Sequence, residues 1–75
     1  MPITYEQALQ SIPKGRYRHY KGNEYEVIGI ARHSETLEPM VVYRALYGEG
    51  GVWVRPAGMW NERVGDVLRF TKIPD

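Results

Sequence analysis

Hydrophobic and polar residues alternate along most of the chain after residue 15, which is typical of half-buried β-strands. Runs of this kind are separated by segments rich in glycine, asparagine and proline, which favour turns. A proline at position 56 cannot donate to a strand ladder and should end the strand before it. The pattern predicts strands at residues 16–20, 25–32, 40–47, 52–55 and 67–73, with a loop or single helical turn at 56–61.

Before residue 15 the pattern indicates a helix. Thr4 followed by Gln7 has the spacing of a capping box, so we expect a short helix over residues 5–11. A helix of two turns is not stable alone and must dock on another part of the fold. Its docking residues are predicted to be Tyr5, Ala8, Leu9 and Ile12.

A chain of 75 residues is expected to form one domain, residues 1–75. Residues 1–14 would form the helix and linker, and residues 15–75 a β-barrel. The predicted fold class is mainly β, a small antiparallel SH3-like barrel of four to five strands with a short N-terminal helix. Both faces of the 40–47 strand are largely apolar, so either the helix covers one face or that face is a binding or dimer surface.

The composition excludes several classes of protein. The chain has no cysteine, which excludes disulfides and thiolate zinc sites and fits a reducing compartment. The N-terminal residues do not have the pattern of a signal peptide, and no apolar run approaches the ~18 residues that a membrane span needs. We therefore expect a cytoplasmic protein with no membrane partner.

The net charge is only +1, but seven of the ten cations are arginine, which suits planar or bidentate contacts. No acidic residue lies between Gln7 and Glu24, where several cations are clustered. This segment is either an ordinary solvated strand face or a surface for nucleic acid. The basic patch predicted here consists of Arg16, Arg18 and Lys21.

Several motifs together resemble a bacterial family catalogued as domain of unknown function 1653. The resemblance covers about residues 15–60 and implies a compact, mostly β, stand-alone domain, without implying any activity. The motifs are Gly15-x-Tyr17-x-His19-Tyr20-Lys21-Gly22, Tyr25-x-Val27, Ala31-x-His33-Ser34-Glu35-Thr36-x-Glu38, Val41-Val42-Tyr43-x-Ala45-Leu46-Tyr47-Gly48 and Trp53-Val54-Arg55-Pro56-x-x-Met59.

The segment from His33 to Glu38 carries the most reactive side chains. A hydrolytic pair of His33 and Ser34 is disfavoured, because adjacent strand residues point to opposite faces. Glu35 and Glu38 could instead bind a metal ion together with His33 and with His19 from the first strand. The alternative, which we favour, is that Glu35 and its neighbours cap a loop.

Nine aromatic residues, six of them tyrosine, are many for a chain of this length. Some should pair across strands in the core. Others could form a platform that stacks bases or sugars beside arginine, or a cage for a cationic side chain. Arg55 could bind a ligand, or form an internal ion pair with Glu35 or Glu38. The predicted ligand-binding residues are Tyr43, Arg44, Tyr47, Trp53 and Arg55, with His19 and His33 at the rim.

The sequence thus favours a small non-catalytic binding module, without a cofactor, whose groove takes nucleic acid or a nucleotide. The first alternative is a protein-interaction domain that uses its apolar second face to bind a protein partner or to form a homodimer. The second is a small metal-dependent enzyme.

Overall fold

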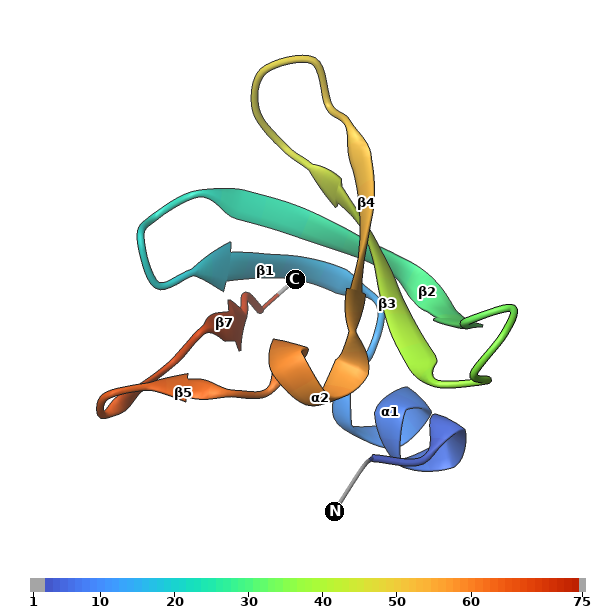
Figure 1. Ribbon diagram of the computed structural model, residues 1–75. Helices are drawn as coiled ribbons and strands as arrows, with labels where there is room; N and C mark the ends of the chain where they lie inside the picture. The colour runs from blue at the N-terminus through green and yellow to red at the C-terminus, as the bar shows by residue number, and fades with distance from the viewer. Residues whose placement is uncertain (1–2, 75) are drawn as a thin grey trace.

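The computed structural model describes residues 3–74 and shows a bent antiparallel sheet with two short helices against one of its faces (Figure 1). The main sheet has the order β4-β3-β2-β1-β7, and β5 and β6 form a separate two-stranded sheet. The predicted domain boundaries at residues 1 and 75 lie outside the described residues. The elements are α1 (Tyr5–Ser11), β1 (Gly15–His19), β2 (Glu24–Arg32), β3 (Pro39–Ala45), β4 (Val52–Pro56), α2 (Ala57–Trp60), β5 (Arg63–Val64), β6 (Val67–Leu68) and β7 (Phe70–Lys72).

Helix α1 begins with the expected capping box. The Gln7 backbone N–H donates to Thr4 Oγ1 at 3.1 Å, and the Thr4 backbone N–H donates to Gln7 Oε1 at 2.9 Å. The helix docks through Ala8 and Ile12, which are 0% and 2% exposed. Leu9 is 49% exposed, so the prediction that it docks is wrong: the buried stripe follows the i, i+4 spacing, and the next residue turns to solvent.

The core lies between the two helices and the sheet. Trp60 of α2 is 1% exposed, and its ring stacks on Phe70 of β7 with centroids 3.7 Å apart. The same indole contacts Tyr17 and Tyr43 edge to face, at 5.4 and 5.0 Å. The sheet face that carries Val41, Tyr43 and Ala45 is therefore the core face. The buried cluster consists of Ala8, Ile12, Tyr17, Val27, Val41, Tyr43, Ala57, Trp60 and Phe70.

A β-bulge in β2 bends the sheet. Val27 pairs with Tyr43, but the next pair along the strands is Gly29 with Val42, so Ile28 is an extra residue. Ile28 is 38% exposed. An inserted residue of this kind bends its strand and increases the local twist, which makes the core face concave.

The mainly β class and the N-terminal helix are confirmed, whereas closure into a barrel is not found. Within residues 3–74 the two edge strands, β4 and β7, do not pair with each other. The segment predicted as one strand at 67–73 is divided at Arg69, because β6 turns back to pair with β5 while β7 pairs with β1. None of the helices in this range has the length and apolar character needed to cross a membrane.

Candidate functional site

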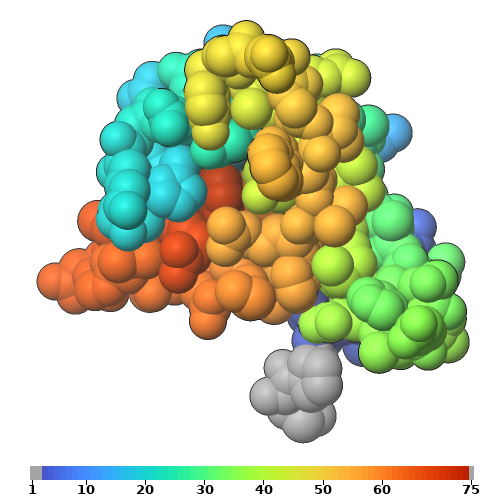
Figure 2. Space-filling model, turned by 45° about the horizontal axis from the view of Figure 1, so that its top comes forward, coloured from blue at the N-terminus to red at the C-terminus, as the bar shows by residue number. Residues whose placement is uncertain are grey.

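The helices cover only part of the concave face, and a hollow remains between two hairpins. In Figure 2 a recess separates the cyan β1–β2 hairpin from the yellow and orange β3–β4 hairpin, with part of the red C-terminal segment at its floor. Residues directly opposite each other on paired strands share a face. Trp53 is paired with Tyr43, and Arg55 with Val41, so both β4 side chains belong to this face. We define the concave groove by His19, Tyr25, Tyr47, Trp53, Arg55 and Phe70.

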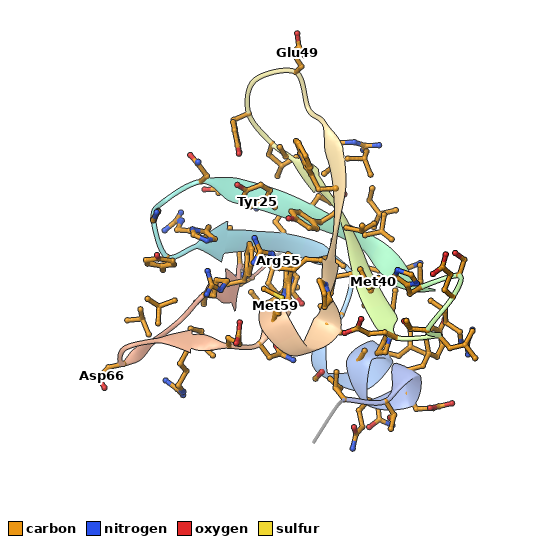
Figure 3. The ribbon with its side chains drawn as sticks, in the orientation of Figure 1. Tyr25, Met40, Glu49, Arg55, Met59 and Asp66 are labelled. Atoms are coloured by element: carbon orange, nitrogen blue, oxygen red, sulfur yellow. The ribbon has the colours of Figure 1, made fainter. Side chains whose placement is uncertain are left out.

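One wall of the concave groove is aromatic and exposed. Trp53 is 60% exposed although its partner Tyr43 is only 7% exposed, because β4 is the edge strand and the helices do not cover this end. Trp53 and Tyr47 line a cavity of about 220 Å³ under the hairpin. A Cβ added at Gly51 would lie 3.2 Å from Trp53 Nε1, so this glycine leaves room for the indole to lie against the backbone. The side chain of Glu49 extends from the hairpin tip (Figure 3), and this residue also lines the cavity.

Tyr25 connects this wall to the floor. Its hydroxyl forms a 2.8 Å hydrogen bond with the Tyr47 hydroxyl, and its ring meets those of Tyr43 and Phe70 edge to face at 5.4 and 5.8 Å. Burial, and then the hydrogen bond with Tyr47, raise the pKa of Tyr25 to about 12. The Tyr25 phenol is therefore protonated at neutral pH and fixes the position of Tyr47.

Arg55 extends from β4 over the floor of the concave groove. Its Cζ lies 5.6 Å from the Phe70 ring centroid (Figure 3), and its Nε is buried. Within residues 3–74 the guanidinium has no ion pair, and Nε has no hydrogen-bond partner. The alternative ion pair with Glu35 or Glu38 is not formed in this part of the chain.

His19 lies on the opposite side of the floor. Its ring is 4.6 Å from Tyr20 and 4.9 Å from Phe70, measured between centroids. Burial lowers the pKa of His19, and the positive charges of Arg69, Arg55 and Lys21 lower it further. His19 Nδ1 accepts a hydrogen bond from the Lys21 backbone N–H at 3.2 Å. The neutral imidazole therefore carries its proton on Nε2.

The structure gathers four of the predicted ligand-binding residues and separates three. Tyr43 is buried in the core and offers no surface to a ligand. Arg44, the next residue, faces the other side of the sheet, where its guanidinium is 3.7 Å from the Glu26 carboxylate. His33 lies in the β2–β3 turn, at the opposite end of β2 from His19. The four residues brought together are His19, Tyr47, Trp53 and Arg55.

His33 closes a turn instead of forming a reactive centre. Its Nδ1 accepts hydrogen bonds from the backbone N–H groups of Glu35 at 3.1 Å and Thr36 at 3.3 Å. The His33 backbone N–H donates to the Glu38 carbonyl oxygen at 2.8 Å, completing the loop. In the described part of the chain, no three histidine, aspartate or glutamate side chains are grouped so that they could hold a metal ion.

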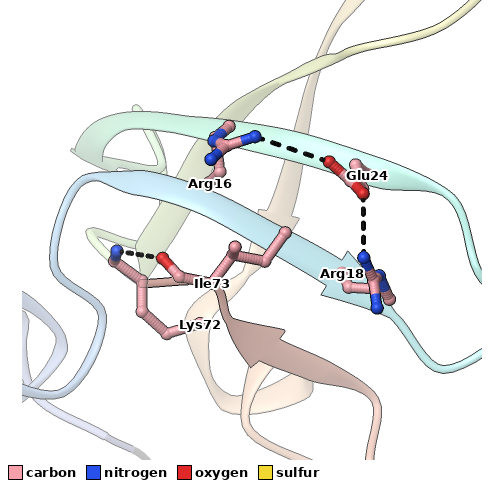
Figure 4. Close-up of polar contacts among 5 residues, drawn as sticks. All are labelled: Arg16, Arg18, Glu24, Lys72 and Ile73. Atoms are coloured by element: carbon pink, nitrogen blue, oxygen red, sulfur yellow. Dashed lines mark hydrogen bonds and ion pairs between the residues drawn. The ribbon is translucent and has the colours of Figure 1, made fainter. Parts of the chain in front are cut away.

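The predicted basic patch is divided, and one acid from the neighbouring strand pairs with both of its arginines. Arg16 and Arg18 lie on the outer face of β1, where their guanidinium nitrogens are 3.9 and 3.1 Å from the Glu24 carboxylate (Figure 4). Lys21 is separate from them, in the β1–β2 turn, with its ammonium 5.8 Å from the Tyr20 ring centroid. The outer face therefore carries a mixed charge pattern and no continuous basic surface.

Sequence reasoning missed two residues of the concave groove, Tyr25 and Phe70, and the arginine that precedes Phe70, Arg69. Arg69 Nε is buried without a hydrogen-bond partner in residues 3–74, and an Arg69 terminal nitrogen lies 3.9 Å from the Glu62 carboxylate. In the sequence, Arg69 and Phe70 are adjacent positions of one uniform strand, on opposite faces, and no local signal marks the break between β6 and β7.

These features define a small, mainly β domain with an open antiparallel sheet and an aromatic groove on its concave face. The chain belongs to the family described as "Protein of unknown function (DUF1653)", whose family model matches residues 15–72. It is similar to the crystal structure of a protein of that family from Bordetella bronchiseptica, with 41% sequence identity and a TM-score of 0.78. That match covers 87% of this chain and 91% of the other. No curated protein matches the chain.

Proposed function

We propose that this protein is a small non-catalytic binding module of the cytoplasm whose concave groove takes nucleic acid or a nucleotide. The observation that carries the proposal is an indole that is 60% exposed, on the same sheet face as an arginine with no acidic partner in residues 3–74. Stacking of a base on an aromatic side chain contributes about 1–3 kcal/mol. Arginine adds a planar, bidentate contact to phosphate.

The position of Trp53 supports stacking over a purely structural role. One edge of the indole lies close to the Gly51 backbone, where no side chain intervenes, while most of the ring is exposed beside Tyr47. The indole is therefore held in place on one side and open to a planar ligand on the other. A base or a nucleotide ring fits this surface, and the neighbouring Arg55 favours a ligand that carries negative charge.

The proposal is tested by ¹⁵N chemical-shift titration with a short single-stranded oligo-uridylate, with UMP and with glucose. We expect shifts at the Trp53 indole N–H and at the backbone amides of Tyr47 and Arg55 for the first two ligands, and none for glucose. Binding of the oligonucleotide should also weaken as salt rises from about 50 to 200 mM. No shift at these positions with millimolar UMP or oligonucleotide would overturn the proposal.

A second candidate function, homodimerisation, is favoured by the outer side of β4. Val52 and Val54 are 53% and 59% exposed on an edge strand, beside the half-buried Val42 of β3. Exposed apolar edges pair readily with another chain, and pairing of β4 with β4 of a second copy gives a symmetric dimer. Sedimentation tests this: a dimer that Val54→Lys dissociates would support it, and a strict monomer at high concentration would contradict it.

A further inference from the structure

We infer that the concave groove binds an extended single strand and seats one of its phosphate groups among Arg55, Arg69 and His19, beside the Phe70 ring. This phosphate seat is distinct from the stacking surface of Trp53 and Tyr47. The inference rests on the proposed function and identifies the part of the groove that recognises charge.

The arginines on the two faces of the sheet differ in their acidic partners. On the outer face, Arg16, Arg18 and Arg44 each have a glutamate within 4 Å. Arg55, on the concave face, has no such partner among residues 3–74, and its Nε is shielded from solvent. A shielded N–H without a hydrogen-bond partner has lost its hydration, and the Phe70 ring face 5.6 Å from Cζ offers it no acceptor oxygen. An anion from solution would supply that acceptor at this position.

Two further groups converge on the same place. Arg69 is 27% exposed at its side chain and has a buried Nε without a hydrogen-bond partner in the described residues. Its ion pair with Glu62 is long, at 3.9 Å, as is that of Arg16 with Glu24, so Arg69 has an acidic partner and its buried Nε is the group left to donate. The Arg69 backbone carbonyl accepts a hydrogen bond from the Tyr20 backbone N–H at 2.9 Å, next to His19. Burial lowers the pKa of His19, and the charges of Arg69 and Arg55 both lower it further. The His19 Nε2–H is an uncharged hydrogen-bond donor in the same groove.

The geometry of β4 links the phosphate seat to the stacking surface. Trp53 and Arg55 lie on the same face of the strand, two residues apart. A strand rises about 3.3 Å per residue, so their backbone positions are separated by about 7 Å. A base stacked on Trp53 and a phosphate at Arg55 can therefore belong to one nucleotide or to neighbouring ones. Stacking on an indole needs an unpaired base, which favours a single strand over a duplex.

The inference is tested with a fluorescein-labelled ten-nucleotide oligo-uridylate by fluorescence anisotropy over a range of salt concentrations. The variants are Arg55→Met and Arg69→Met, and the matched control is Arg44→Met on the opposite face. Loss of one phosphate contact should weaken binding about 5- to 30-fold and reduce the slope of log K against log salt by about 0.7. Arg44→Met should change the affinity by no more than about 2-fold and should leave the salt slope as it is in wild type.

UMP and uridine separate the two parts of the groove. The wild-type protein should bind UMP more tightly than uridine, because only UMP carries a phosphate. Arg55→Met should abolish this preference, while both ligands should still shift the Trp53 indole N–H resonance. If Arg55→Met does not fold, Arg55→Lys and Arg69→Met provide the same comparison, with Arg55→Lys keeping the charge and losing the bidentate contact.

The outcomes distinguish the inference from the proposed function. If the oligonucleotide binds at Trp53 but Arg55→Met and Arg69→Met behave like Arg44→Met, the phosphate seat is wrong and the proposed function stands. If a duplex of the same length binds as tightly as the single strand, the assignment to single strands is wrong. Wild-type protein that binds neither the oligonucleotide nor UMP overturns both.

Discussion

Replacing Trp53 with alanine should separate binding from folding. The indole is 60% exposed, so about 40% of its roughly 250 Å² is buried, which corresponds to about 2.5 kcal/mol at ~25 cal/mol per Å². Alanine keeps part of that burial and the unfolded chain is compact, so the expected loss of stability is about 1–2 kcal/mol. A domain of 75 residues has a total stability of roughly 4–11 kcal/mol, so the variant should remain folded.

The same substitution should have a large effect on affinity. Loss of about 1–3 kcal/mol of base stacking corresponds to about 5- to 150-fold weaker binding of the oligo-uridylate. Anisotropy titration measures the affinity, and thermal unfolding checks the fold. The matched control is Val54→Ala, since Val54 is adjacent, similarly exposed at 59%, and on the opposite face. A folded Trp53→Ala protein that binds as tightly as Val54→Ala would refute the stacking role.

Three further substitutions test other parts of the structure. Gly51→Ala places a Cβ 3.2 Å from Trp53 Nε1, so the indole N–H resonance should move and the oligo-uridylate affinity should fall; an unchanged resonance would contradict the packing. His33→Ala removes the acceptor for two turn amides and should cost about 1 kcal/mol, or about 4–8 °C in thermal unfolding, without changing the affinity of the groove. Burial raises the pKa of Tyr17 from its ordinary value of 10.0 to about 12, so the unfolded state loses this proton first and stability falls as pH rises from 10 towards 12. Tyr17→Phe should therefore reduce the loss of stability measured by denaturant unfolding over that range, and an unchanged slope would refute the assignment.

Local signals in the sequence identified the helix and the main strands. The Thr4–Gln7 capping box gave α1 its correct first residue, because both hydrogen bonds are made within four residues. The division of the last strand at Arg69 was not predictable in this way. It depends on which strands are paired: β6 with β5 and β7 with β1. Hydrophobic and polar residues alternate along 67–73 whichever strands are paired, so the sequence predicts one continuous strand.

The candidate site shows the same limit. Alternation placed Trp53 and Arg55 on one face of β4 correctly, but it gives no account of what covers that face. Tyr43 and Trp53 are direct cross-strand partners, yet one is buried under α2 and the other is exposed at the sheet edge. Which of the two side chains is buried therefore depends on the position of α2. This helix is four residues long and has no side-chain cap by which the sequence could predict it.

The net charge of +1 reflects ten cations and nine acids, and the fold distributes them unevenly between the two faces of the sheet. Glu24 and Glu26 in β2 face outward and accompany arginines of β1 and β3, which leaves the outer face close to neutral. On the concave side, Arg55 has no acidic partner in residues 3–74. A chain with this arrangement has little long-range attraction for polyanions and a local positive field in one groove. Such a field suits recognition of one or two phosphates in defined positions better than coating of a nucleic acid surface.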